Sequence, residues 1–169
     1  MGFAFSSQAF AKLELPQNLT SSDRQEALRI IGLGTSAKIL TNPYALGGYH
    51  GIEFGIALES IPTEDVSRLG SRLPNPQAEV TIPKLTVGKG LYSNLDFFIH
   101  FMPYNQNSEL SQYGGVLRWG FYEASSIPIS ANITAHMNFG NINNQLTTKT
   151  YGADLIGAIN VNEVALYAG

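Results

Sequence analysis

The sequence predicts an all-β fold in which antiparallel strands follow one another up and down, preceded by a short N-terminal helix. Three observations support this prediction. Apolar and polar residues alternate with a period of two over most of the chain after residue 47. Charged residues make up 14% of the chain, whereas a soluble domain carries about 25%. The connections between the predicted strands are long and short in turn. Together they predict an antiparallel up-and-down β-barrel.

The composition excludes several other classes of protein. The chain has 169 residues, which suits one domain, and an aromatic content of 11% argues against disorder. No run of about 18 apolar residues is present, so a helical membrane protein is excluded. A net charge of -3 gives no basic field for nucleic acid. The absence of cysteine excludes disulfides and thiol chemistry, and nothing in the sequence predicts a cofactor.

Residues 1–11 are uncharged and end in Ala9-Phe10-Ala11, a small-residue pattern of the kind found at signal-peptide cleavage sites. The basic and fully apolar regions of a signal peptide are missing. Two interpretations stay open, a remnant of a signal peptide or an ordinary apolar N-terminus.

Residues 12–46 are predicted to form a helix and a loop. Ser22 and Gln25 fit a capping box, a motif in which two side chains bond the first backbone N–H groups of a helix. Gly32 is the expected stop. The apolar positions between them are Ala27, Leu28, Ile30 and Ile31.

About seven strands are predicted within residues 47–169, the barrel region. The alternation is longest over residues 127–140, and the phase over residues 78–89 slips around Pro83. Segments 47–59, 93–104 and 127–141 are long enough for a tilted strand to cross a membrane, which takes about 9–11 residues. The predicted strands are residues 52–59, 78–89, 95–102, 117–122, 127–140, 151–160 and 164–168.

Long and short connections alternate along the chain. Segments 61–77, 103–111 and 140–149 are long, whereas segments 88–93, 123–126 and 162–163 are short. Outer-membrane barrels have longer loops on one side of the membrane and short turns on the other.

The two faces of the predicted strands also differ. One carries Ile, Leu, Phe, Trp and Met, and the other carries Gly, Asn, Ser, Thr, His and isolated charges; residues 124–148 contain no charged side chain. This pattern is typical of a lipid-facing surface and a lumen. Six tyrosines near strand ends suit interfacial aromatic girdles: Tyr49, Tyr92, Tyr104, Tyr113, Tyr122 and Tyr151.

Over residues 47–169 the alternation and loop lengths resemble those of bacterial outer-membrane β-barrel proteins. In addition, Gly32-Leu-Gly-Thr-Ser-Ala-Lys38 with Asn42-Pro43 is similar to the N-terminal region of the long-chain fatty-acid transporter family. That region precedes the first strand and plugs the barrel in the family. The resemblance implies a transmembrane β-barrel in the bacterial outer membrane, with the lipid bilayer as its partner.

The chain departs from that resemblance at its end. Barrels of this class have an even number of strands and end in an aromatic residue, whereas residues 165–169 stop in mid-strand. An odd count leaves an open sheet edge, which lipid cannot satisfy. We expect the remaining strands to lie outside this chain; closure through another subunit is the alternative.

The candidate site is a set of polar residues on the non-lipid phase of the strands. In a narrow barrel they would pair and form a structural core, and in a wide one they would line a channel. No catalytic, cofactor-binding or metal-binding residues are predicted. The candidate lumen-lining residues are Glu53, Glu59, Asp96, His100, Arg118, Asn132, His136 and Asp154.

Other motifs are weak. Residues 32–37 match the dinucleotide fingerprint G-x-G-x-x-A, but Asn42-Pro43 would stop the helix that it requires. Ser130 and His136 lie about 20 Å apart on one strand, too far for a catalytic pair. Asn18 and Asn132 begin Asn-x-Thr sequences that we attribute to chance.

The predicted function is that of an outer-membrane β-barrel, acting as a passive pore, a small-solute transporter or a structural envelope protein, and not as an enzyme. One alternative is a soluble lipocalin-like barrel that binds an apolar ligand, in which Ile52 and Phe54 would point inward. Another is a barrel enzyme that acts on lipid through serine and histidine.

Overall fold

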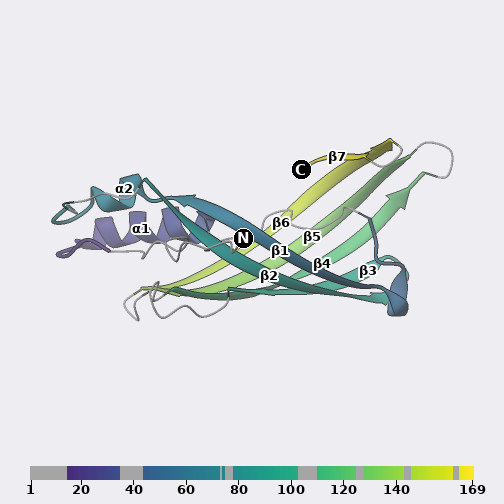
Figure 1. Cartoon of the computed structure of the whole chain (residues 1–169), viewed down its shortest axis with the longest axis horizontal. Coiled ribbons are helices and arrows are strands. Elements are labelled where there is room, and N and C mark those ends of the chain that lie inside the picture. The colour runs from purple at the N-terminus through teal and green to yellow at the C-terminus, as the bar shows by residue number, and fades with distance from the viewer. Residues whose placement is uncertain are drawn as a thin grey trace, which may run out of the picture.

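A computed structural model of the chain describes residues 15–34, 44–72, 74, 78–102, 110–124, 128–142, 146–161 and 164–169. Its main element is one antiparallel sheet in which each strand is hydrogen-bonded to its neighbours in the sequence, in the order β1-β2-β3-β4-β5-β6-β7 (Figure 1). The expected antiparallel, up-and-down arrangement with a short helix is therefore confirmed. The strands are β1 Ile52–Pro62, β2 Glu79–Tyr92, β3 Leu95–Phe101, β4 Leu110–Glu123, β5 Ile129–Ile142, β6 Leu146–Val161 and β7 Val164–Ala168.

The sheet is curled, so that β1 and β2 cross over β4, β5 and β6 in the view of Figure 1. We call the inner surface of this curl the concave face and the outer surface the convex face. Helix α1 (Ser21–Gly34) and the short helix α2 (Glu64–Ser67) lie at one end of the strands, and a single helical turn, η1 (Gly48–His50), precedes β1. No helix of the described residues is long and apolar enough to cross a membrane.

The capping box of α1 is formed by residues other than those expected. The Asp23 carboxylate accepts hydrogen bonds from the Thr20 backbone N–H at 3.0 Å and from the Thr20 hydroxyl at 2.9 Å. The Asp23 N–H in turn donates to the Thr20 hydroxyl at 3.2 Å. The prediction of Ser22 and Gln25 was therefore wrong by two residues. Both pairs of residues offer a hydroxyl and, three positions later, a side-chain acceptor, so the sequence motif fits either pair.

The expected helix stop at Gly32 was also wrong, since α1 continues to Gly34. Gly32 is buried, and a side chain there would meet the Thr150 methyl group at 3.4 Å. Its lack of a side chain thus allows the helix to approach β6, instead of ending the helix.

Strand β2 passes through Pro83 without a change of phase, contrary to expectation. Pro83 pairs with Leu58 of β1, and the pairing of β2 with β3 extends only as far as Leu85. Proline lacks a backbone N–H. Because β3 has already ended beside Pro83, no inter-strand hydrogen bond to β3 is lost there.

The expected pattern of connections holds only in part. The β5–β6 connection, expected to be long over residues 140–149, has three residues, because β5 extends to Ile142 and β6 begins at Leu146. The predicted long strand over residues 93–104 is shorter in the structure: β3 has seven residues. Residues 1–11, Tyr104 and most of the segment similar to the fatty-acid transporter family lie outside the described residues.

The barrel region, expected from residue 47, begins its first strand at Ile52. Gly47 and Gly48 have φ angles of 79° and 80°, which are left-handed and incompatible with a strand. Among the described residues, β1 pairs only with β2 and β7 only with β6, so that the sheet is open between its first and last strands.

Candidate functional site: the polar concave face

The eight predicted lumen residues all fall on the phase of the strands that faces the concave side. Asp96, His100, Arg118 and Asn132 are each at most 2% exposed. The remaining ones range from buried to partly exposed: Glu59 is buried, whereas Glu53, His136 and Asp154 are partly exposed. The concave face therefore carries the buried charges of the sheet.

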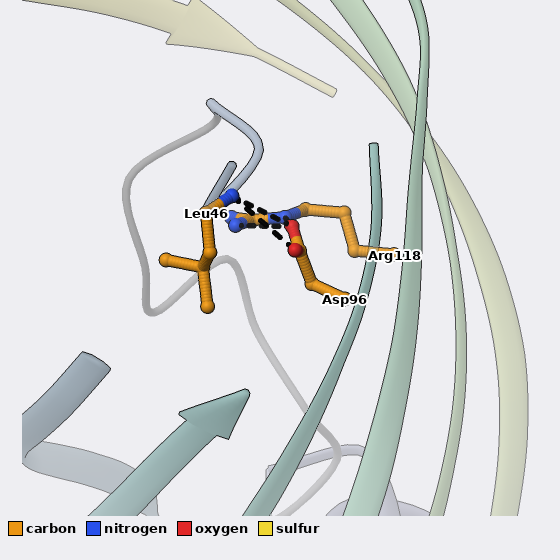
Figure 2. A network of polar contacts seen from close by, with 3 residues as sticks. All are labelled: Leu46, Asp96 and Arg118. Atoms are coloured by element: carbon orange, nitrogen blue, oxygen red, sulfur yellow. Dashed lines mark hydrogen bonds and ion pairs between the residues drawn. The ribbon is translucent and has the colours of Figure 1, made fainter. Parts of the chain in front are cut away.

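Asp96 and Arg118 form the best-connected pair on this face, and they are direct partners across β3 and β4. Arg118 Nη2 lies 2.9 Å and Nε 3.1 Å from Asp96 Oδ2 (Figure 2). The guanidinium also lies over the Phe98 ring, 4.7 Å from its centroid. Such a fork of donors on one carboxylate fixes both side chains in a single geometry.

A backbone group completes the site around Asp96. The Leu46 N–H donates to both carboxylate oxygens at 3.2 Å, so residues before η1 are held against the concave face (Figure 2). Gly48 lies close enough to β2 that its carbonyl oxygen would be 2.0 Å from a side chain at Gly90. We call residues 44–51 the strap.

Glu59 and Lys84 form a second buried pair, of which only Glu59 was predicted from the sequence. Lys84 Nζ lies 2.7 Å from Glu59 Oε2, and the two side chains are 0% and 4% exposed. Lys84 was not among the predicted residues because the slip assumed at Pro83 placed it on no definite face. Its spacing of two from Ile82 and Thr86 was the signal that could have found it.

The two strand histidines bond to polar side chains of other strands, His100 of β3 across β4 to β5 and His136 of β5 to the adjacent β6. His100 Nε2 is hydrogen-bonded to Asn138 Oδ1, and Asn138 Nδ2 donates to Thr150 Oγ1 at 3.2 Å. His136 Nδ1 lies 3.1 Å from Asp154 Oδ2, which also accepts a hydrogen bond from Thr134 at 3.1 Å. Asn138 is a further concave-face residue that the sequence reasoning did not select.

Three glycines make room for large side chains on this face. A Cβ atom at Gly88 would lie 2.3 Å from the Phe98 ring, one at Gly114 2.5 Å from His100 Nε2, and one at Gly152 2.4 Å from His136 Nε2. These side chains therefore lie flat over the glycines of neighbouring strands. The glycines that the sequence places on the polar phase of the strands thus have a packing role.

Helix α1 packs over the concave face at one end of the strands. Ala27 and Ile31 of the helix are buried, and among the described residues they form an apolar cluster with residues of β1, β2, β5 and β6, of α2, and of the position after β3. Its other members are Ile61, Val66, Val80, Ile82, Met102, Ile142 and Leu146.

The chemistry of the concave face is that of paired groups. No cluster of three or more potential metal ligands occurs in the part of the chain that the structure describes. Ser130 and His136 point to the same face six residues apart on β5, with partners at Ala158 and Gly152. Gly32 and Gly34 of the dinucleotide-like motif lie in the last turn of α1, and residues 15–20, which are described directly before this helix, form no strand.

The convex face is apolar and exposed. Phe54 and Ile56 are 78% and 82% exposed, and a hollow of about 470 Å³ surrounds Gly115 between the apolar side chains of β3, β4 and β5. The exposed charged residues of the strands all lie within four residues of a strand end: Glu79, Lys89, Glu123 and Lys149. The Lys89 amine donates a hydrogen bond to the Tyr49 carbonyl oxygen.

In comparisons with known proteins, the chain matches no protein-family model, no curated protein and no solved structure.

Proposed function

We propose that this chain forms a β-barrel wall in a bacterial outer membrane, with its convex face against lipid and its concave face as a filled, polar interior. The observation that carries the proposal is the inversion of burial. The apolar phase of the strands is exposed, while Asp96, Arg118 and Lys84 are buried. A soluble sheet buries its apolar face and exposes its charges, whereas a membrane barrel does the opposite.

The dimensions of the convex face support a lipid contact. On β5 the apolar phase runs from Ile129 to Phe139, about 33 Å at 3.3 Å per residue. A strand tilted by about 40° would then present an apolar band about 25 Å tall, which is the height of the band on outer-membrane barrels. The exposed charged residues lie within four residues of strand ends, and Lys149 pairs with Phe139 at one end of that band. A lysine near the end of a strand can extend its amine toward the interface.

Aromatic residues lie toward both ends of the band. Tyr113 stacks on Phe139 with centroids 5.3 Å apart, toward the α1 end. Tyr49 and Tyr92 form an edge-to-face pair at 6.4 Å, near the opposite end. Exposed aromatic rings at two levels suit the two interfaces of a bilayer, where an apolar ring and a hydroxyl are both satisfied.

The interior favours a structural role over ion conduction. The buried charges pair with neighbours along the sheet, as Glu59 does with Lys84, and leave no ring of like charge among the described residues. Helix α1 and the strap also lie on the concave face. A channel that selects ions needs exposed groups of one sign along its path.

The single tryptophan of the chain gives a direct test, because Trp119 is on the convex face and 55% exposed. The full chain is reconstituted in vesicles with lipids brominated along the acyl chain. We expect strong quenching of Trp119 fluorescence by these lipids and little quenching by aqueous acrylamide, since an apolar ring in the bilayer touches acyl chains.

The matched control moves the tryptophan to the concave face. In the variant that combines Trp119→Phe with Phe98→Trp, the only indole replaces a side chain that is 2% exposed. Brominated lipid should leave it unquenched. Equal quenching at both positions, or purification of the chain as a stable monomer without detergent, would contradict the proposal. Conductance steps in a planar bilayer would contradict the structural role alone.

A further inference from the structure

The hollow around Gly115 is a recess between large side chains of the convex face. Its lining includes two small residues, Gly115 and Ala135, and larger ones such as Phe97, Leu117 and Tyr151. A Cβ atom at Gly115 would lie 3.4 Å from the Phe97 ring, which is an ordinary van der Waals contact. Packing within the sheet therefore does not require a glycine at this position, in contrast to the glycines of the concave face. Here the missing side chain leaves space on the outer surface.

The size and the lining of the hollow are those of a site for an apolar group. Its volume of about 470 Å³ falls within the range of ligand pockets, about 300–1,000 Å³. It extends along β4 from Tyr113 to Leu117, about 13 Å at 3.3 Å per residue. Leu117, Ala135 and Met137 give it an apolar lining. A recess of this length and chemistry suits a flexible hydrocarbon chain.

The polar groups beside the hollow lie toward the α1 end of the strands. Tyr113 and Lys149 are the two partners of Phe139 in the sheet, whereas the row at the other end of the hollow contains Leu117 and Ala135. The hollow is thus apolar at one end and has a hydroxyl and an amine beside the other. This arrangement matches an amphiphile, which has one polar end and an apolar body.

Lys149 supplies the charge at the polar end. It is exposed, and it lies before Tyr151 on the same face of β6, about 7 Å away along the strand at 3.3 Å per residue. Within the part of the chain that the structure describes, Lys149 forms no salt bridge. In a bilayer, an amine at the end of an apolar band lies at the level of the headgroups, where it attracts an anion. A neutral protein segment over the hollow would leave this amine without an anion, whereas an anionic headgroup supplies one.

We propose that the hollow and Lys149 form a binding site for one anionic phospholipid, with an acyl chain in the hollow and the phosphate headgroup at the Lys149 amine. The inference rests on the proposed function, because it takes the convex face to lie in a bilayer, and it adds which lipid this face selects. The acyl chain contacts Leu117 and Met137, and the headgroup lies at the level of Tyr113. One lysine near a membrane surface should favour an anionic lipid over a neutral one by about fivefold.

A tryptophan at the edge of the hollow can measure this preference in the full chain. Trp119→Phe combined with Tyr151→Trp places the only indole at a lining residue that is 69% exposed. The variant is reconstituted in two sets of vesicles, both with equal amounts of phosphatidylglycerol and phosphatidylcholine. Bromine is carried on the acyl chains of the first lipid in one set and of the second lipid in the other. We expect the phosphatidylglycerol to associate with the indole about fivefold more strongly. Equal quenching by the two lipids would overturn this inference and leave the proposed function standing.

Two further substitutions in this variant test the two parts of the site. Lys149→Gln removes the cation, and Gly115→Leu fills the hollow with an apolar side chain at a residue whose φ is not positive. Each should bring the association of the two lipids close to equality. Lys89→Gln is the matched control, because it removes an exposed lysine at the opposite end of the strands and should leave the preference unchanged. A preference that survives Lys149→Gln or Gly115→Leu contradicts the proposal.

The unsubstituted Trp119 provides the control for position. It lies beyond Gly115 on β4, about 13 Å away along the strand at 3.3 Å per residue, and does not line the hollow. The two brominated lipids should quench it equally. If Trp119 is quenched and the indole introduced at position 151 is quenched by neither lipid, another protein chain covers the hollow and this inference fails alone. If neither position is quenched, the proposed function fails with it.

Discussion

The convex and concave faces of the sheet are made from alternate residues of the same strands, yet they obey opposite rules. The convex face exposes Phe54 and Ile56, whereas the concave face buries Lys84 and Asp96. Hydropathy therefore does not predict which face of the strands is buried. What decides burial is the curl of the sheet, since residues inside the curl are covered by α1, the strap and each other, whatever their polarity.

The comparison also shows how each face is kept stable. On the concave face, charged groups lie next to opposite charges and large side chains lie over glycines. On the convex face, apolar side chains have few protein neighbours. Their contribution to the free energy of unfolding therefore depends on the surrounding medium. Changes on the concave face should therefore act in any solvent, and changes on the convex face should depend on lipid.

The largest expected effect comes from breaking the Asp96–Arg118 pair. Arg118→Met leaves the carboxylate of Asp96 buried without its cation, which should lower the free energy of unfolding by about 3–5 kcal/mol. Urea titration of the protein in detergent or vesicles measures it. Adding Asp96→Asn should recover part of the loss. Arg29→Ala, which removes an exposed pair with Glu26, is the control and should change little. Similar effects of Arg118→Met and Arg29→Ala would contradict the importance of burial.

The next effect tests whether the convex face meets lipid. Leu155, which is 63% exposed, lies in the middle of the apolar row of β6. Leu155→Lys should destabilise the reconstituted protein by about 2–4 kcal/mol, because an amine in mid-bilayer is costly. The control is Thr147→Lys at the polar end of the same strand. If both variants unfold at the same urea concentration as the parent, the convex face meets water.

A smaller effect is expected from filling a glycine on the concave face. Gly88→Ala places a methyl group 2.3 Å from the Phe98 ring, and the required shift should cost about 1–3 kcal/mol. Gly157→Ala on β6 is the matched control, since no atom lies within 4 Å of a Cβ there. Chemical denaturation distinguishes the two. Equal stability of both variants would mean that the large side chains are not fixed over the glycines.

The smallest effect concerns pH and the start of α1. Hydrogen bonds from Thr20, the backbone one first, lower the pKa of the Asp23 carboxyl below its ordinary value. The stabilisation is thus fully present above the ordinary pKa of an aspartate and is lost as the pH falls through the lowered value. Circular dichroism spectra recorded at steps of about one pH unit, from about pH 6 down to about pH 2, should show a slight loss of helix. Asp23→Asn should flatten this dependence, and an unchanged profile would contradict the capping role.

The alternation of residue types was sufficient to predict the strands and the face on which each candidate site residue lies. It predicted β5 nearly to its ends and placed Asp96, Arg118 and Asp154 on one side, because successive side chains of a strand point to opposite faces. Local signals were less reliable. Pro83 did not change the alternation of β2, because β3 has already ended beside it. Gly32 did not end α1, because its lack of a side chain allows the helix to approach β6.

The pairing of the site residues lay beyond local pattern. Asp96 and Arg118 are 22 residues apart, and Glu59 and Lys84 are joined only through the register of β1 and β2. The anchoring of Asp96 to the Leu46 N–H joins residues 50 positions apart through a segment with no regular pattern. Such contacts depend on how the sheet curls and which residues fold over it.

The sequence by itself determined that the chain makes an antiparallel sheet with one apolar and one polar face, because a period of two is a local property of the extended backbone. The tertiary structure decided which face is inside. Either face could have been covered, and the curl of the sheet, together with α1 and the strap, covers the polar one. The low charge of the chain follows from both facts: the outer face is apolar, and the inner face holds only charges that have a partner or room beside a glycine.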